Sequence, residues 1–225
     1  MIMCTYKNRI EGSAPATGST GKFPHITISE YPDDIFQNII AVTNRRLAAR
    51  PLPEQVERVC RYHPKAVILR EKDLSETEYT ALAQEIMEIC KKYDVPCILH
   101  TYLNTAKELG CPAIHLPLPL LRKYADRSGP AISTLTTIGV SVHSAREALE
   151  AELLGAAYLT AGHIYATDCK KGIPPSGTGF LRKVCQSVSI PVYAIGGIKP
   201  DPRQISEIIS CGASGGCIMS GMMTL

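Results

Sequence analysis

Short apolar runs alternate with amphipathic segments from residue 39 to the end of the chain. Most of these runs are apolar throughout rather than at every second position, which is typical of strands buried on both faces of a parallel sheet. The pattern predicts eight strands, at residues 39–43, 66–69, 96–99, 113–116, 137–142, 157–160, 191–195 and 217–219.

Helical periodicity occupies most of the intervals between the runs. It is clearest at residues 77–93, where Ile86 and Cys90 recur at helical spacing and Ser75 with Glu78 has the spacing of a capping box. Further helices are expected at residues 53–62, 105–109, 145–154, 180–188 and 202–211. Glycines stand where three of these helices should end, at Gly110, Gly155 and Gly212.

Eight strands alternating with helices predict a (β/α)₈ TIM barrel over residues 38–225. A doubly wound sheet is the alternative, because the number of strands does not show that the sheet closes. No GxGxxG motif opens a helix, which disfavours the dinucleotide-binding form of that fold. The chain ends soon after the last run, so the final helix is expected to be missing. Residues 1–37 are expected to form a flexible N-terminal extension.

Composition narrows the class of protein. The 225 residues fit one barrel, and 45% of them are hydrophobic. A net charge of +3 and the absence of Trp argue against nucleic acid as a partner, whereas a small anionic ligand fits that charge. No apolar run approaches the roughly 18 residues of a membrane span, and no apolar signal core precedes the fold. A cytoplasmic protein is therefore expected.

The nine cysteines agree with that location. Their number is odd, none lies in a CxxC pair, and most lie in apolar runs. Buried, reduced thiols are expected, rather than disulfides or a zinc site.

In a TIM barrel, functional side chains lie at the carboxyl ends of the strands and in the loops that follow. Polar clusters at residues 139–144, 162–172 and 194–198 occupy such places. Applied to the whole chain, this rule selects Asn44, Arg70, Lys72, His100, Thr101, His115, Ser141, His143, His163, Thr167, Lys170, Gly196, Gly197, Ser220 and Gly221.

His143 is the first candidate for catalysis, because it follows the longest run and histidine can both take and give a proton near neutral pH. A histidine held at a helix N-cap is an equally good interpretation. No carboxylate has ligand-like spacing to His100 or His115, so no metal site is predicted, and His115 is expected to be a core or rim histidine.

Two further groups are candidates for binding anions. Gly196-Gly197 and Ser220-Gly221 follow the last two strands, where TIM barrels often bind phosphate through backbone N–H groups, although both are also consistent with tight turns. Arg70 and Lys72 face the same way if the strand continues, and Lys170 can join them around a carboxylate or phosphate. In the alternative interpretation Glu71 and Asp73 neutralise Arg70 and Lys72 in a rim network.

Several of these segments together resemble one family. Residues 162–172, read as Gly-His-Ile-Tyr-Ala-Thr-Asp-Cys-Lys-Lys-Gly, carry the resemblance, with residues 69–72, 115–117, 141–144, 194–197 and 219–221. Over residues 38–221 the chain resembles the family of thiamine phosphate synthase and the TenI-type thiazole tautomerase, and the tautomerase branch is the closer match.

The resemblance to the synthase branch implies two Asp residues that hold Mg²⁺ for a diphosphate leaving group. One would follow an Asn at the end of the third strand, where this chain has His100-Thr101. The other would lie a few residues past His115-Leu116, where residues 117–120 read Pro-Leu-Pro-Leu. Because Mg²⁺ requires oxygen ligands, only Thr101 remains as a weak candidate. The synthase pattern also has Gln where this chain has Ile68, and Thr where it has Cys169.

The resemblance to the tautomerase branch implies an aromatising isomerisation of a carboxythiazole phosphate, with His143 as the catalytic residue and no cofactor. The implied substrate-binding residues are Arg70, Lys72, His100, Ser141, Thr167 and Lys170, and the implied phosphate-binding residues are Gly196, Gly197, Ser220 and Gly221. The expected partner is the phosphorylated thiazole, and the family resemblance suggests a homodimer. A thiamine phosphate synthase and a non-catalytic TenI-like binding or regulatory protein remain the alternatives.

Overall fold

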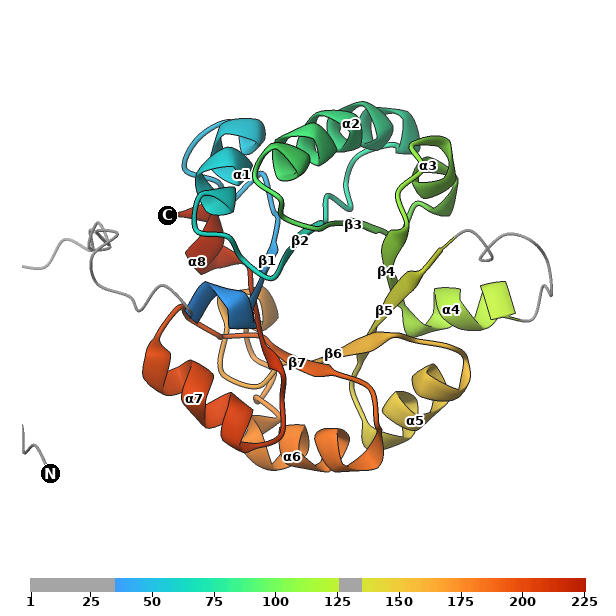
Figure 1. Cartoon of the computed structure of the whole chain (residues 1–225). Helices are drawn as coiled ribbons and strands as arrows, with labels where there is room; N and C mark the ends of the chain where they lie inside the picture. Colours follow the sequence, from blue (N-terminus) through green and yellow to red (C-terminus); the bar gives the residue numbers. More distant parts are fainter. Residues whose placement is uncertain (1–34, 126–134) are drawn as a thin grey trace, which may run out of the picture.

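The parallel sheet of the protein closes on itself. A computed structural model describes residues 35–125 and 135–225, and its strands follow the order β1-β2-β3-β4-β5-β6-β7-β8 in a closed barrel. Closure is direct, because β1 pairs with β2 on one side and with β8 on the other, where Ile40 is in register with Cys217. Figure 1 shows the ring of strands surrounded by helices. The predicted TIM barrel is confirmed, and the doubly wound alternative is wrong.

The strands lie close to the predicted positions. They are β1 Ile39–Val42, β2 Ala66–Leu69, β3 Cys97–His100, β4 Ala113–Pro117, β5 Thr137–Val142, β6 Tyr158–Gly162, β7 Val192–Ile195 and β8 Gly215–Ile218. The largest shift is at β8, which begins at Gly215 rather than Cys217. Its first two residues are glycines, which give no hydrophobic signal, and a Cβ at Gly215 would overlap the backbone of Asn38.

Eight α-helices and two short 3₁₀ helices are present in the described residues. The α-helices are α1 Leu52–Cys60, α2 Glu76–Lys92, α3 Leu103–Glu108, α4 Leu118–Ala125, α5 Ala145–Leu153, α6 Gly177–Ser187, α7 Pro202–Ser210 and α8 Ser220–Met223, and the 3₁₀ helices are η2 Ile35–Asn38 and η3 Asp168–Lys170. Ser75 and Glu78 form the predicted capping box of α2. Gly110, Gly155 and Gly212 have positive φ angles where α3, α5 and α7 end.

Two helices correct the sequence analysis. The expectation of a missing final helix is wrong, because α8 follows β8, although it has only four residues. The helix α4 was not predicted, since Pro119 lies within it. Proline is tolerated in the first turn, where the backbone N–H has no partner inside the helix, so Pro119 marks a helix start and not a break.

The start of the fold also differs from the prediction. Most of the expected N-terminal extension, residues 1–34, lies outside the described residues. Its last part does not match the expectation, because Ile35 and Phe36 in η2 are 5% and 3% exposed. The folded unit therefore begins before residue 38.

Apolar side chains fill two layers. Ile39 and Ala41 of β1 join the large core between the strands and the helices, whereas Ile40 and Val42 point into the barrel. The inner layer is completed by Ala66, Ile68, Ile98, Tyr158, Tyr193 and Cys217. Because every strand is buried on both faces, the apolar runs carry no alternation, as the sequence suggested.

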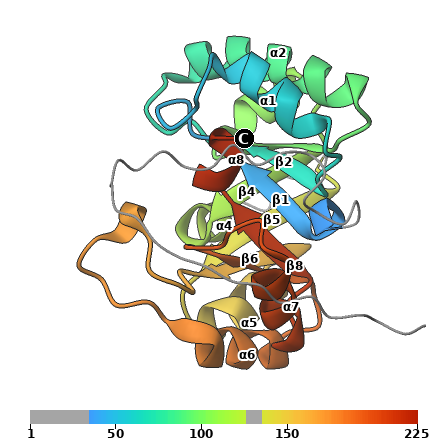
Figure 2. The same ribbon diagram turned by 90° about the vertical axis from the view of Figure 1, so that its left-hand side faces the viewer.

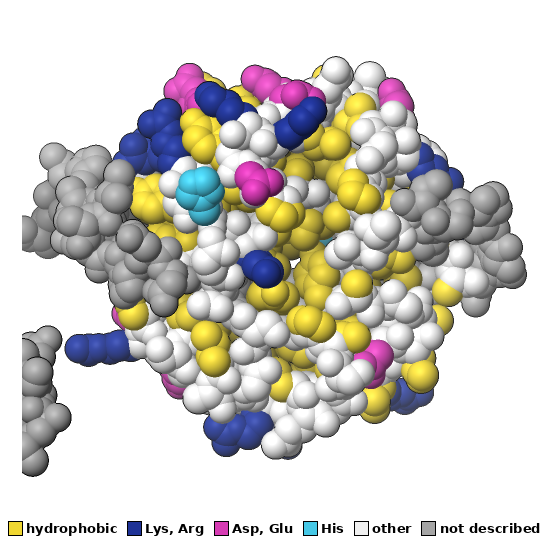
Figure 3. Space-filling view, in the orientation of Figure 1, with side chains coloured by type: hydrophobic (Ala, Val, Ile, Leu, Met, Phe, Trp, Pro, Cys, Tyr) yellow, Lys and Arg dark blue, Asp and Glu magenta, His cyan; other side chains and the backbone are white. Residues whose placement is uncertain are grey.

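The two ends of the barrel differ. In Figure 2 the segment between β6 and α6 projects from the carboxyl end, on the left, and η2 lies at the amino end, on the right. Figure 3 views the amino end, where hydrophobic side chains surround a central depression. None of the described helices has the length and apolarity needed to cross a membrane. The eight cysteines of the described ranges carry free thiols, and Cys169 is exposed.

Candidate active site

The carboxyl end of the barrel collects the candidate residues from many strands. Arg70 directly follows β2, His100 ends β3, His143 directly follows β5, Gly196 directly follows β7, and Ser220 lies one residue beyond Met219, which follows β8. In a barrel of parallel strands these ends meet around one opening. The structure thus brings residues that are far apart in sequence to one mouth.

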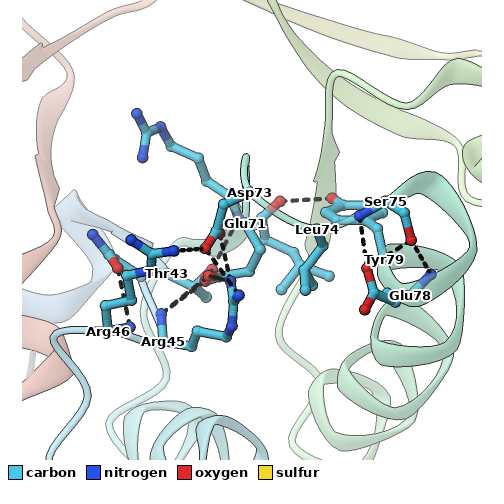
Figure 4. A network of polar contacts seen from close by, with 12 residues as sticks. Thr43, Arg45, Arg46, Glu71, Asp73, Leu74, Ser75, Glu78 and Tyr79 are labelled. Atoms are coloured by element: carbon cyan, nitrogen blue, oxygen red, sulfur yellow. Dashed lines mark hydrogen bonds and ion pairs between the residues drawn. The ribbon is translucent and has the colours of Figure 1, made fainter.

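The acidic residues beside Arg70 and Lys72 pair with other cations. Arg45 Nη1 lies 2.5 Å from Asp73 Oδ1 and 3.2 Å from Glu71 Oε2, and Arg46 Nη2 lies 2.5 Å from Asp73 Oδ2 (Figure 4). The hydrogen bond from Arg45 lowers the pKa of Asp73 to about 2. The alternative interpretation, in which Glu71 and Asp73 neutralise Arg70 and Lys72, is therefore wrong.

Three cations at the mouth are left without such partners. Among the described residues no ion pair or side-chain hydrogen bond joins Arg70, Lys72 or Lys170 to a carboxylate. Burial lowers the pKa of Lys72, and the positive charges of Arg70 and Lys170 lower it further. Burial likewise lowers the pKa of Arg70. Like charges held together at an opening favour an anionic ligand.

A cavity of about 250 Å³ opens beside these cations. Lys72, His100, Thr101, Tyr102 and Pro117 contribute to its lining, together with Glu71. The hydroxyl of Thr101 lies 2.6 Å from His100 Nδ1. The sequence analysis selects Lys72, His100 and Thr101 as candidates and names Pro117 only within the segment that carries the family resemblance. It misses Tyr102, whose place in the loop after β3 was the available signal.

Below the mouth, two histidines are buried in the barrel. The ring of His115 lies between the hydroxyls of Tyr158, 3.0 Å from Nδ1, and Ser141, 2.8 Å from Nε2. Its ring stacks on that of His100 with the centroids 5.8 Å apart. Burial lowers the pKa of His100 to about 2 and that of His115 to about 3. Both rings are therefore neutral at physiological pH, and the prediction of a core histidine at position 115 is confirmed.

Ser141 belongs to the same buried group. Besides its contact with His115, its hydroxyl accepts a hydrogen bond of 3.1 Å from Thr160. The partners of Ser141 are thus side chains of the barrel interior, and its predicted contact with a substrate stays a prediction.

His143 has different surroundings, because its side chain is exposed. Its Nδ1 lies 2.7 Å from the carbonyl oxygen of Gly162 at the end of β6. A carbonyl oxygen only accepts hydrogen bonds, so Nδ1 carries the proton, and in the neutral ring Nε2 holds a lone pair. The N-cap of α5 is Ser144, whose hydroxyl accepts from Glu147 N, and the backbone N–H of the preceding His143 donates to Glu147 Oε2 at 2.6 Å. The backbone of His143 is therefore bonded at the start of α5, whereas its ring contacts Gly162.

The glycines after β7 have a packing role of their own. Gly196 and Gly197 have φ angles of +93° and +70°. A Cβ at Gly196 would overlap His163, and one at Gly197 would lie 2.6 Å from the carbonyl oxygen of Ala166. The tight turn at Gly196 and Gly197 thus packs closely against the β6–α6 segment. This turn lies beside the hydrogen bond between His143 and Gly162, because Gly162 is in register with Ile195, the residue before Gly196.

The remaining candidates lie at the rim. Ser220 is the first residue of α8 and Gly221 the second, and the first N–H groups of a helix have no partner within it. Thr167 precedes η3, its side chain forms no capping hydrogen bond there, and Lys170 is the exposed last residue of η3.

The residues of the mouth do not fit the Mg²⁺ site of a diphosphate-cleaving enzyme. Thr101 directly follows β3, and residues 117–120, from the end of β4 onward, contain no carboxylate, although the resemblance to the synthase branch implies an Asp at each place. Glu71 and Asp73 are already bonded to Arg45. Within the described ranges no group of three or more His, Cys, Asp or Glu side chains can hold a metal ion.

Fold and mouth together define a TIM-barrel protein with a cationic site at the carboxyl ends of its strands. The profile of the family described as thiamine monophosphate synthase, TMP-TENI, matches residues 39–222. The chain belongs to this family.

Individual relatives agree with that assignment. The chain is 33% identical over 188 residues to thiamine-phosphate synthase 2 of Streptococcus pneumoniae, which covers 81% of this chain and 85% of that protein. It is 29% identical over 197 residues to the thiamine-phosphate synthase of Clostridium novyi, with coverages of 84% and 92%. The solved thiamine phosphate pyrophosphorylase of Pyrococcus furiosus superposes with a TM-score of 0.70 at 28% identity, covering 84% of this chain and 89% of that one.

Proposed function

We propose that the protein is an isomerase of thiamine biosynthesis, which aromatises a carboxythiazole phosphate by proton transfer through His143. The observation that carries the proposal is the contact of His143 Nδ1 with the carbonyl oxygen of Gly162. With Nδ1 bonded to Gly162, Nε2 is left as the proton-accepting nitrogen of a side chain that is exposed at the mouth.

The reaction needs one group that takes a proton and then returns it. Nε2 of His143 removes the proton from the ring carbon that bears the carboxylate, and the C–H electron pair forms a new ring double bond. The ring double bond already present shifts by one position towards the exocyclic carbon, the electron pair of the exocyclic double bond moves to its outer carbon, and that carbon takes the proton back from Nε2. The carbonyl of Gly162 accepts from Nδ1–H throughout, so it stabilises the imidazolium that forms between the two steps.

The anionic groups of the substrate are matched by donors that follow other strands of the barrel. Arg70, Lys72 and Lys170 supply positive charge without a carboxylate partner among the described residues, which suits the carboxylate of the substrate. Backbone N–H groups at Gly197 and Ser220 suit its phosphate. His100 remains neutral and lines the adjoining cavity.

A second candidate is thiamine-phosphate synthase, a transferase that joins a pyrimidine diphosphate to the thiazole phosphate. The names of the relatives favour it. The residues at the ends of β3 and β4 weigh against it, since they offer no carboxylate for Mg²⁺.

The third candidate is a non-catalytic binding or regulatory protein. A cytoplasmic location, a homodimer and the absence of a nucleic-acid partner stay predictions.

One assay separates the three candidates. The protein is incubated with the non-aromatic thiazole tautomer, and aromatisation is followed by absorbance. A parallel reaction contains hydroxymethylpyrimidine diphosphate, the aromatic thiazole phosphate and Mg²⁺, and is analysed for thiamine phosphate. We expect the first product and not the second. Formation of thiamine phosphate alone would establish the synthase. If neither product forms, the result favours the non-catalytic binding protein.

A pair of variants tests the role of His143. We expect His143→Asn to lower the rate of aromatisation by roughly 10²–10⁴, the usual contribution of one acid–base group. The matched control is His63→Asn. His63 is exposed between α1 and β2, at the opposite end of the barrel, and Asn tolerates its φ of +47°. Equal rates in the two variants would remove His143 from the mechanism.

A further inference from the structure

The hydroxyl of Thr43 joins the ends of the first two strands. Thr43 directly follows β1 and is fully buried. Its Oγ1 accepts a hydrogen bond of 2.9 Å from the backbone N–H of Arg70 and donates one of 2.7 Å to Glu71 Oε1. One side chain therefore holds both the backbone of a cationic residue of the mouth and the carboxylate beside it.

The carboxylate of Glu71 is hydrogen-bonded by two residues of the segment after β1, Thr43 and Arg45. Its side chain is 2% exposed. Besides Thr43, it accepts from the backbone N–H of Arg45 at 3.1 Å to each oxygen and from Arg45 Nη1 at 3.2 Å (Figure 4). Its buried contacts thus face the β1–α1 segment, while the residues on either side of it, Arg70 and Lys72, are cations of the mouth.

A second hydroxyl joins the end of β2 to the neighbouring strand β3. Tyr79 of α2 donates a hydrogen bond of 2.6 Å to the carbonyl oxygen of Leu69 and accepts one of 2.8 Å from the backbone N–H of His100. The backbone at Arg70 is therefore tied to β1 through Thr43, and the residue before it is tied to β3 through Tyr79. The end of β2 has little freedom to shift.

Two like charges close together repel, so Arg70 and Lys72 need an external restraint to address the same ligand. We propose that Thr43 and Glu71 are positioning residues, which fix the end of β2 so that Arg70 and Lys72 face one anionic group of the substrate. The inference rests on the proposed function, and it adds a pair of residues that act through the positions of Arg70 and Lys72.

An electrostatic role and a positioning role of Glu71 predict opposite changes in substrate affinity for one variant. Glu71→Gln removes a negative charge near the cations. If charge alone mattered, the mouth would become more positive and an anionic substrate would bind more tightly. If the carboxylate acts by holding the β1–α1 segment against β2, the variant disturbs Arg70 and Lys72, and the substrate binds more weakly.

The experiment compares variants at this junction. In the isomerisation assay we expect Thr43→Val to raise KM about tenfold, close to the value of one buried hydrogen bond, with a smaller effect on kcat. Thr43→Ser keeps the hydroxyl and should restore the wild-type KM. Glu71→Gln should raise KM. The matched control is Asp73→Asn, which breaks exposed ion pairs to Arg45 and Arg46 but leaves Thr43 and Glu71 in contact. It should keep the wild-type KM.

A merely structural role gives a different result. It would lower kcat in proportion to the folded fraction, measured by circular dichroism, and leave KM unchanged, and that result would overturn the proposal. Tighter binding by Glu71→Gln would overturn it as well. If Thr43→Val does not fold, Thr43→Ala removes the same hydroxyl without adding a methyl group, and it should show the same rise in KM.

Binding separates this inference from the proposed function. Calorimetry with thiazole-2-carboxylate, which carries the carboxylate assigned to Arg70 and Lys72 and no phosphate, measures this anion site without any turnover. If the wild-type protein binds this carboxylate but does not isomerise the thiazole phosphate, the function is wrong, and the positioning role is still tested by the Kd of the same variants, which should rise about tenfold for Thr43→Val. If the wild-type protein does not bind the carboxylate, the anion site at Arg70 and Lys72 does not exist and the inference fails too.

Discussion

Histidines at the carboxyl end of the barrel differ in what surrounds each ring. His100 and His115 are 6% and 3% exposed, and burial keeps them neutral. His143 is exposed, and the carbonyl of Gly162 orients its ring. Sequence placed all three at strand ends or within strands. It could not assign the proton on His143, because Gly162 is 19 residues away in the chain and only the pairing of β5 with β6 brings it close.

The buried histidines make stability depend on pH. Their folded pKa values, about 2 and about 3, lie below the ordinary value near 6.5. Below pH 6.5 the unfolded chain therefore binds protons that the folded protein does not, and the free energy of unfolding falls as the pH falls from 6.5 towards about 3. Each histidine contributes at most about 1.4 kcal/mol per pH unit in that window.

A single variant measures that contribution. Urea unfolding at pH 7 and pH 5 should show a larger loss of stability for the wild-type protein than for His115→Gln, by up to about 2 kcal/mol. The carboxylates titrate equally in both proteins, so the difference reports His115. Equal losses in both would mean that the folded protein protonates His115 in this range.

Strand pairs depend on small residues that a hydrophobicity pattern does not explain. Gly139 of β5 is in register with Tyr158 of β6, and a Cβ at Gly139 would overlap the tyrosine ring. That ring carries the hydroxyl that contacts His115. The strands themselves were predictable from their apolar runs, but the need for glycine here arises from a side chain on the neighbouring strand.

Gly139→Ala should therefore destabilise the protein by about 1–3 kcal/mol in urea unfolding, the usual cost of overpacking a core. The control is Gly179→Ala in α6, where a Cβ would meet no atom within 4 Å. That variant should be neutral or more stable by up to about 1 kcal/mol, because it reduces the entropy of the unfolded chain. A similar loss of stability in both variants would contradict the packing argument.

Closure of the whole barrel brings its first and last elements together. Gln55 of α1 is fully buried, and its Nε2 donates a hydrogen bond of 2.7 Å to the carbonyl oxygen of Met222 in α8. Arg50 donates to the carbonyl oxygen of Leu225 at 2.8 Å, and the backbone N–H of Ala49 donates to the carbonyl oxygen of Met223 at 2.9 Å. The segment around α1 therefore holds α8, although α8 has only four residues.

Gln55→Leu tests this connection. It leaves the carbonyl of Met222 without its side-chain donor, so urea unfolding should show a loss of about 1–3 kcal/mol. Gln84→Leu, on the exposed side of α2, is the control and should change stability by no more than about 0.5 kcal/mol. An equally small effect of both changes would show that α8 does not depend on Gln55.

Local patterns along the chain were sufficient for the order of the strands, for every α-helix except α4 and α8, for the cap of α2 and for the end at which polar residues gather. These features depend on neighbours within a few residues, since strand burial, capping and helix termination are local. Tertiary packing decided which residues form ion pairs with each other. Glu71 and Asp73 could have neutralised Arg70 and Lys72, their neighbours in sequence, yet they pair with Arg45, 26 and 28 residues away. Charge interactions act through space, and the pairing of β1 with β2 brings Arg45 to Glu71 and Asp73. Only the tertiary structure therefore shows that Arg70 and Lys72 remain available to a ligand.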